Sequence, residues 1–141
     1  MLAAAATTIR STAVRVAATI DVAAIGMARI AAPPDIDGML ARIQNDLFDL
    51  GADLCVRETE EPPEHPPLRA TAAQTERLER WIDQANDALQ PLTSFVLPGG
   101  SAGAAYLHHA RTVCRRVERE VFLLAEFEAI NPHVTMYLNR L

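Results

Sequence analysis

The sequence predicts an all-α protein, an up-and-down bundle of four to five helices, in one domain spanning residues 1–141. Half of the residues are hydrophobic but only 5% are aromatic, so the core must consist mainly of Ala, Leu, Val and Ile. Apolar residues recur at helical spacing in five segments, and no stretch between them alternates as a half-buried strand does. A chain of 141 residues can form one such core but is short for two.

The first two predicted helices are separated by a pair of prolines. Residues 7–31 form the first helix, which Pro33 and Pro34 stop. The second helix is expected to end near Gly51, and residues 57–68, with four Pro and four Glu, form a polar loop. The second helix carries one apolar stripe, which consists of Ile36, Met39, Leu40, Ile43, Leu47 and Leu50.

Capping residues mark where the remaining helices begin. Thr71 can cap the third helix while Gln74 reaches back to it, and this helix is expected to continue to Pro91. Trp81 on this helix is expected to be a core residue. The fourth helix follows the cap Ser101.

The fourth helix is expected to run to about Phe127. A fifth helix then begins with Asn131 as its cap and Pro132 at its first position. Because the Ala-rich first helix has little apolar area to bury, a monomer would be marginally stable, and an oligomer is expected.

The composition excludes several classes of function. A net charge of -5 without a basic, aromatic-rich strip argues against nucleic-acid binding. All 13 cationic residues are Arg, so phosphate binding would depend on guanidinium groups. Cys55 and Cys114 lack metal-type spacing and are interpreted as reduced intracellular thiols that act as small apolar residues. His108 and His109 face different directions on a helix, and no metal site is predicted.

The N-terminal 32 residues have the composition of a transit peptide, because they are rich in Ala, Thr, Ser and Arg. The helical periodicity continues into the domain, however, and no apolar run approaches the ~20 residues that a membrane span requires. A domain helix and a cytoplasmic protein without membrane association are therefore expected.

Charged residues on the fourth helix lie beside the apolar face rather than opposite it. Arg111, Arg115 and Glu118 share one stripe, with Leu107 above and Phe122 below. Charges bracketed by large apolar residues indicate an interface or the wall of a cleft; the alternative is a row of exposed ion pairs. The apolar face lies about a quarter-turn away and consists of Ala110, Val113, Val117, Val121 and Leu124.

The turn before this helix is also informative. Pro98, Gly99 and Gly100 form a turn that leads into the cap Ser101, and a glycine-rich turn before a helix can bind an anion. Phe95, just before the turn, is either an ordinary core residue or a residue of the site.

Four segments of the chain together match the motifs of a known family: Ile43-Gln-Asn-Asp-Leu-Phe-Asp-Leu-Gly-Ala-Asp53, Phe95-Val-Leu-Pro-Gly-Gly100, Arg111-x-x-x-Arg115-Arg116-x-Glu118-Arg119 and Tyr137-Leu-Asn139-Arg140-Leu141. With these segments, residues 16–141 resemble the ATP-dependent corrinoid adenosyltransferases of the propanediol-utilisation type, which are trimeric, ferritin-like helical bundles that convert cob(I)alamin to adenosylcobalamin. Thr19-Ile20-Asp21 resembles that family's Val-Asp-Glu-Leu-Asn motif and keeps its Asp.

The resemblance implies a nucleotide site formed by Arg115, Glu118 and Asn139. In the reaction it implies, cobalt in the +1 state attacks the 5′ carbon of ATP and expels triphosphate. No side chain is then needed as nucleophile or base. Guanidinium groups can neutralise the departing triphosphate with paired hydrogen bonds.

The resemblance also implies a corrinoid contact and a subunit contact. Phe95 would close over the corrin, and Arg111 would pair with Asp21 across a subunit boundary of a homotrimer. ATP with magnesium and a corrinoid would be the ligands. A corrinoid reductase or an adenosylcobalamin-dependent enzyme would be a partner.

The chain departs from the family pattern at both ends. A Thr- and Gly-rich segment with a Gly-Asp pair and a Lys, which wraps the triphosphate in the family, is expected to be absent, and the last helix is expected to be shortened. The alternative hypothesis is therefore a non-catalytic corrinoid-binding or purely structural bundle that has lost ATP binding.

Overall fold

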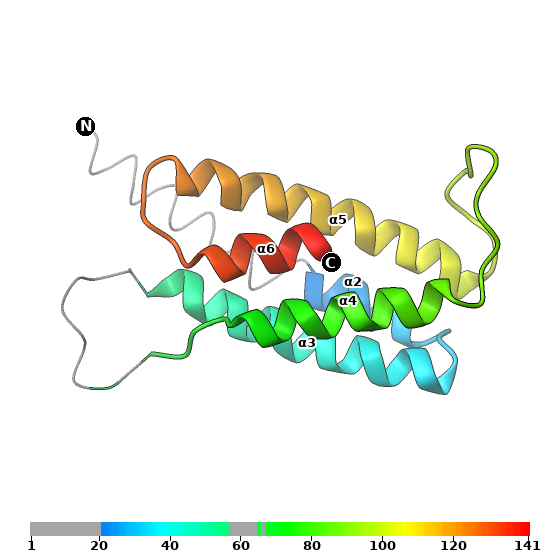
Figure 1. Ribbon diagram of the computed structural model, residues 1–141, viewed down its shortest axis with the longest axis horizontal. Helices are drawn as coiled ribbons and strands as arrows, with labels where there is room; N and C mark the ends of the chain where they lie inside the picture. Colours follow the sequence, from blue (N-terminus) through cyan, green and yellow to red (C-terminus); the bar gives the residue numbers. More distant parts are fainter. Residues whose placement is uncertain (1–20, 57–64, 66) are drawn as a thin grey trace.

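The computed structural model describes residues 21–56, 65 and 67–141, except for the side chain of Asp21. These residues form helices and connecting segments and contain no strand, which confirms the all-α prediction. Figure 1 shows that successive helices run in opposite directions, as in an up-and-down bundle. The helices are α2 (Asp21–Arg29), α3 (Pro34–Cys55), α4 (Ala72–Asn86), α5 (Ala102–Ala125) and α6 (Pro132–Arg140).

Two of the predicted helix ends are wrong. Helix α3 continues one turn past Gly51 to Cys55, because Asp53 and Leu54 in that turn are buried and keep the chain helical. Helix α4 ends at Asn86, before the predicted end at Pro91. The residues that follow Asn86 are exposed and bury no apolar face that would stabilise another turn. Helix α2 lies within predicted helix 7–31, whose earlier part is outside the described residues.

The predicted caps are confirmed. Ser101 Oγ accepts a hydrogen bond from the Ala104 amide at 3.2 Å, and Asn131 Oδ1 accepts one from the His133 amide at 3.0 Å. Gln74 Oε1 accepts a bond from the Thr71 amide at 2.8 Å, as a capping box requires. Helices α5 and α6 therefore begin where local side-chain chemistry sets them.

The core forms where α2 and α6 each pack against their neighbouring helices. Helix α2 packs against α3 and α5, and α6 packs against α4, α5 and α3. Gly103 allows the start of α5 to approach the end of α2 closely, because a Cβ at Gly103 would lie 2.9 Å from the carbonyl oxygen of Ala31. Among the side chains that fill the core are Leu47, Leu50, Leu78, Val117, Val121, Leu124, Val134, Tyr137 and Leu138.

The predicted apolar face of α5 is buried, except that Val113 is only half-buried. The thiol prediction is half right: Cys114 is buried in the core, but Cys55 is exposed at the end of α3, so it does not act as a core residue. Trp81 is half-buried, and the Arg77 guanidinium lies 5.6 Å from its ring centroid. None of the described helices is long and apolar enough to cross a membrane.

Candidate nucleotide groove between the last two helices

A groove of about 280 Å³ lies between the middle of α5 and the C-terminal turn of α6. Both helices reach it because their caps fix where they begin and their apolar faces meet in the core. The residues that line the groove are Arg111, Cys114, Arg115, Leu138, Asn139, Arg140 and Leu141. Charged and polar side chains therefore line this space together with Cys114 and two leucines.

Beside the groove, Glu118 of α5 contacts Arg115 of the same helix and Asn139 of α6, and we call this set of three residues the seam. Only 4% of the surface of Glu118 is exposed. Its Oε2 accepts a hydrogen bond from Nη1 of Arg115, one turn earlier on α5, and its Oε1 accepts one from Nδ2 of Asn139 at 2.8 Å. The structure thus brings together the three residues predicted to form the nucleotide site. Both Arg115 and Asn139 keep further donors for a ligand in the groove.

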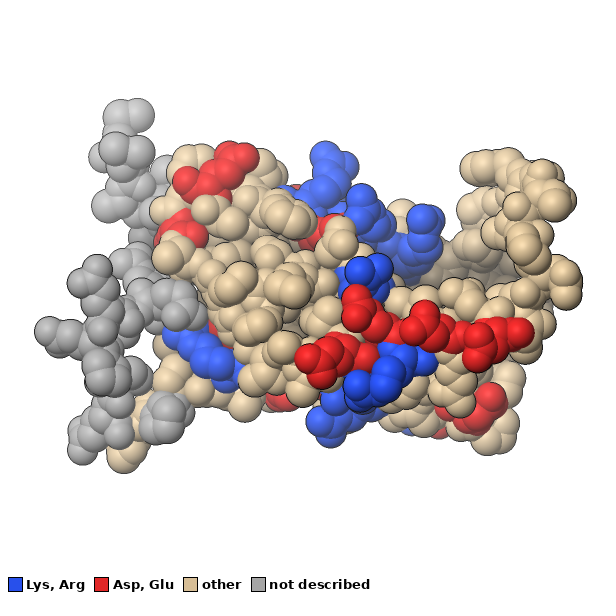
Figure 2. All heavy atoms as spheres, viewed as in Figure 1, with Lys and Arg blue, Asp and Glu red and all other residues tan. Residues whose placement is uncertain are grey.

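Three guanidinium groups line the groove. Arg111 and Arg115 are exposed on α5, and Arg140 on α6 pairs with Glu79 of α4 at 3.1 Å. Figure 2 shows basic residues gathered over α5 and a row of acidic residues along α4. Because guanidinium groups bind phosphate oxygens in pairs of hydrogen bonds, this side of the molecule suits a polyanion.

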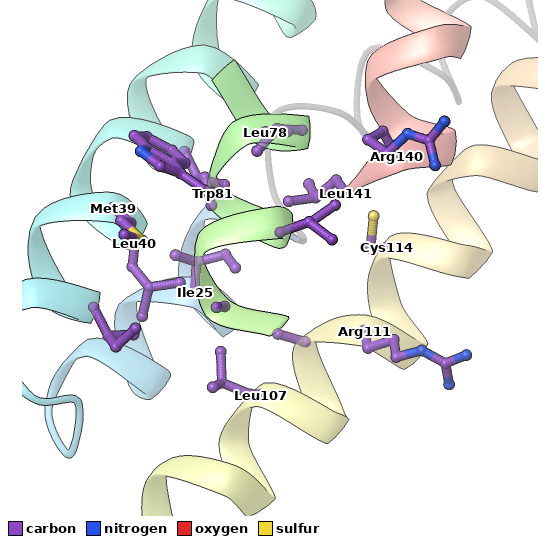
Figure 3. Close-up of a pocket in the computed structure, with 15 residues that line it drawn as sticks. Ile25, Met39, Leu40, Leu78, Trp81, Leu107, Arg111, Cys114, Arg140 and Leu141 are labelled. Carbon is purple, nitrogen blue, oxygen red and sulfur yellow. The ribbon is translucent and has the colours of Figure 1, made fainter. Parts of the chain in front are cut away.

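An apolar pocket of about 330 Å³ adjoins the groove and shares four lining residues with it: Arg111, Cys114, Arg140 and Leu141. Its other lining residues come from α2, α3, α4 and α5, and Trp81 and Met39 are among them. In Figure 3 the guanidinium groups of Arg111 and Arg140 extend away from the apolar side chains, on the same side of the pocket. The shared wall thus places apolar surface next to cationic groups.

Of the other predicted site residues, Phe95 is not brought to the groove. Phe95 lies in the segment between α4 and α5, which projects past the end of the bundle in Figure 1. Its side chain is 87% exposed and lines neither the groove nor the apolar pocket. Asp21 begins α2, but its side chain lies outside the described residues, so its pairing with Arg111 stays a prediction.

Sequence reasoning assigned no role to two buried carboxylates on α3. Asp46 and Asp53 lie seven residues apart and therefore on one face of α3. Asp53 Oδ2 accepts bonds from the Ala70 amide at 2.6 Å and from Asn131 Nδ2 at 2.7 Å. Arg69 Nη1 donates to Asp53 Oδ1 at 2.6 Å. The position of both carboxylates beside the predicted apolar stripe was the signal that they would be buried.

Asp46 is fully buried and contacts both α4 and α6. Nη2 of Arg77 lies 2.5 Å from its Oδ2, and the hydroxyl of Tyr137 donates to the same oxygen at 3.1 Å. Burial, followed by the negative charge of Asp46, raises the pKa of Tyr137 far above its usual value. The Tyr137 hydroxyl therefore stays protonated and remains a donor.

The fold and the groove define a helical-bundle protein whose last two helices line a groove with arginines, one of which is held by the buried Glu118. The chain belongs to the cobalamin adenosyltransferase family, whose model matches residues 7–141. It is 49% identical over 123 residues to a corrinoid adenosyltransferase of Mycobacterium tuberculosis (strain ATCC 25618 / H37Rv), in an alignment that covers 84% of this chain and 63% of the relative.

Two further similar proteins also carry the name of this family. The chain is 44% identical over 109 residues to a cobalamin adenosyltransferase of Cupriavidus metallidurans, covering 77% of this chain and 55% of that protein. It is similar to the structure of a variant PduO-type ATP:corrinoid adenosyltransferase from Lactobacillus reuteri complexed with cobalamin and ATP, with a TM-score of 0.84 and 30% identity, covering 94% of this chain and 73% of that one. The chain thus spans less than two thirds of the length of these two curated relatives.

Proposed function

We propose that this protein transfers the 5′-deoxyadenosyl group of ATP to cob(I)alamin or a related corrinoid, forming adenosylcobalamin and triphosphate. The single observation that carries the proposal is the seam at Glu118, where Arg115 and Asn139 converge on one buried carboxylate at the edge of a cationic groove. The relatives named above as corrinoid adenosyltransferases, and the structure with cobalamin and ATP, support the choice of ligands.

The reaction needs positioning and charge rather than a general base. The electron pair of cobalt(I) forms the new Co–C bond to the 5′ carbon, and the C–O bond breaks as triphosphate leaves with its electrons. Arg115, with Arg111 and Arg140 nearby, would neutralise the triphosphate, which carries magnesium. Glu118 would hold the Arg115 guanidinium in one orientation, so that little reorganisation is needed during the reaction.

The corrinoid side of the proposal rests on the exposed segment and on a second protomer. We propose that Phe95 contacts the corrin and that Arg111 pairs with Asp21 of a neighbouring protomer in a homotrimer. The partly exposed side chains of Leu107 and Phe122, on the same helix as Arg111, offer apolar surface for such an interface. A corrinoid reductase would supply cobalt(I), and an adenosylcobalamin-dependent enzyme would take the product, in the cytoplasm.

The test of activity uses the full chain, cob(I)alamin and ATP under anaerobic, reducing conditions. Adenosylation converts the cob(I)alamin absorbance spectrum to that of adenosylcobalamin, and omission of ATP should prevent the change. An unchanged spectrum with ATP present would remove the catalytic proposal. If cobalamin still bound in that case, a non-catalytic corrinoid-binding function would replace it.

The trimer has a separate test. Light scattering after size-exclusion chromatography should give three times the chain mass of 15.4 kDa. Arg111→Glu should lower this mass, because a like charge would then face Asp21. A monomer at all concentrations would contradict the homotrimer and the pairing of Arg111 with Asp21, but would leave the seam at Glu118 intact.

A further inference from the structure

Helix α6 is held between two buried carboxylates on opposite sides. Tyr137 and Asn139 are two residues apart, so their side chains point about 200° apart around the helix at 100° per residue. Tyr137 points to Asp46 of α3, and Asn139 points to Glu118 of α5. Between them, Leu138 is buried against the core, and its carbonyl oxygen lies 3.8 Å from Sγ of Cys114.

Of the two contacts, Tyr137 to Asp46 and Asn139 to Glu118, the one at Asp46 is held by more partners. Asp46 is fully buried, and its carboxylate is held by Arg77 at 2.5 Å, by Gln74 Nε2 at 3.5 Å and by Arg42 Nε at 3.7 Å, in addition to the Tyr137 hydroxyl. A buried carboxylate with several partners on two helices cannot shift without losing them. Asn139, by contrast, is exposed, and Glu118 is its one side-chain hydrogen-bond partner among the described residues.

The phenol group of Tyr137 is the directed contact that α6 makes on the side opposite Asn139. A rotation by one residue, about 100°, would turn Asn139 away from Glu118. Burial of Val134 and Leu138 already prevents so large a rotation. Within the narrower range that these apolar contacts allow, a directed hydrogen bond from Tyr137 selects one setting of the helix.

We propose that Asp46, acting through Tyr137, is a positioning residue of the nucleotide groove: it fixes the rotation of α6 that brings Asn139 to Glu118. This inference rests on the proposed function for its effect on ATP. Its structural part, the setting of Asn139 by Tyr137, is independent of that function.

The principal test is a double-mutant cycle measured as ATP affinity of the full chain by titration calorimetry. Tyr137→Phe removes only the hydroxyl and should weaken ATP binding about tenfold, as expected for loss of a hydrogen bond to a charged group. Asn139→Ala should weaken it to a similar extent. In the Asn139→Ala background, Tyr137→Phe should have little further effect, because both changes remove the same contact. Equal weakening in both backgrounds would overturn the proposal.

A control separates positioning from loss of stability. Leu54→Ala removes a buried side chain of α3 that takes no part in the Asp46 contacts and lies two turns, about 12 Å, further along the helix from Asp46, so it should lower the melting temperature at least as much as Tyr137→Phe. Its ATP affinity should remain within about twofold of wild type, since sites this far apart act independently. If Leu54→Ala weakens ATP binding as much as Tyr137→Phe does, the effect is general destabilisation and the proposal fails.

A measurement without ATP distinguishes this proposal from the proposed function. In NMR spectra, the side-chain NH₂ signals of Asn139 report its hydrogen bond to Glu118, and Glu118→Gln supplies the reference shift for its loss. Tyr137→Phe should move these signals in the same direction as Glu118→Gln does. If wild type binds no ATP but the signals move, the proposed function fails and the positioning role stands. Unmoved signals overturn the positioning role whether or not ATP binds.

Discussion

Glu118, in the seam between α5 and α6, is buried and has both carboxylate oxygens hydrogen-bonded, whereas Phe95, between α4 and α5, is 87% exposed. Both belong to motifs from which the site was predicted. The seam is organised by contacts within one chain. The exposed segment presents a run of apolar side chains that no described part of the same chain covers, namely Leu89, Leu92, Phe95, Val96 and Leu97.

This difference indicates that the nucleotide half of the proposed site, at Glu118, and the corrinoid half, at Phe95, depend on different kinds of contact. In the proposed function, the nucleotide contacts at Glu118 are preorganised by the buried residues that hold α6, so changes to those residues should be transmitted to them. In the proposed function, Phe95 contacts a ligand or a second protomer, so the isolated chain should fold equally well without that contact. Changes in either region therefore test whether the two halves are separable.

The largest effect is expected from Asp53→Ala. This change removes the carboxylate that holds Asn131, the cap of α6, and α6 carries Asn139 of the seam. The change leaves the buried Ala70 amide and Asn131 side chain without the carboxylate that accepts from them. The free energy of unfolding should fall by about 3–4 kcal/mol, measured by urea denaturation. Asp83→Ala, on the exposed face of α4, should change it by less than about 0.5 kcal/mol. Similar values for the two variants would mean that Asp53 does not anchor α6.

Arg115→Ala comes next and acts on the seam directly. Loss of a charged hydrogen-bond donor to both Glu118 and the ligand should weaken ATP binding about 100-fold, or about 2.7 kcal/mol, measured by calorimetry. Arg116→Ala is the matched control, because Arg116 is also exposed on α5 but does not line the groove. If both variants lose affinity equally, the overall charge of α5, and not the seam, binds the nucleotide.

Phe95→Ala tests the exposed segment. Because burial of a Phe side chain contributes about 1.5–3 kcal/mol, cobalamin binding should weaken about tenfold in an absorbance titration. The ATP affinity and the unfolding midpoint should stay at wild-type values, since Phe95 contacts neither the groove nor the core. Leu92→Ala, from the same segment, should leave cobalamin affinity nearly unchanged. A large loss of ATP affinity in Phe95→Ala would show that the two halves are not separable.

Whether a contact could be predicted from the sequence depended on how far apart its two residues lie along the chain. Caps such as Ser101 and Asn131 depend on residues two or three positions away, so their sequence neighbourhood identifies them. The bond from Asn139 to Glu118 spans 21 residues and was accessible only through the family resemblance. The bond from Tyr137 to Asp46 spans 91 residues, and no local pattern specifies it. The exposure of Phe95 was not predicted either, because an apolar residue before a turn can be a core residue or a residue of a site.

The smallest effect is expected at a carboxylate that is neither in the seam nor in the exposed segment. Arg29 donates to Asp37 at 2.6 Å, and this hydrogen bond lowers the pKa of Asp37 below its usual value. A lowered pKa contributes stability that is present above the unfolded-state value of 3.8 and is lost as the pH falls through the folded-state value. Asp37→Asn should therefore be slightly less stable than wild type at pH 7 and equal to it near pH 2.

Thermal melts at several pH values measure this difference, and high salt should reduce it, since both side chains are more than one third exposed and screened by solvent. We expect that a short ion pair stabilises this fold strongly only where the carboxylate is buried. If Asp37→Asn lost as much stability at pH 7 as Asp53→Ala does, this expectation would be wrong. Asp37 and Asp53 each have an arginine nitrogen at 2.6 Å, but Asp53 is buried and also accepts hydrogen bonds from the Ala70 amide and Asn131. The two variants thus compare an exposed ion pair with a buried carboxylate that has several partners, as Glu118 has.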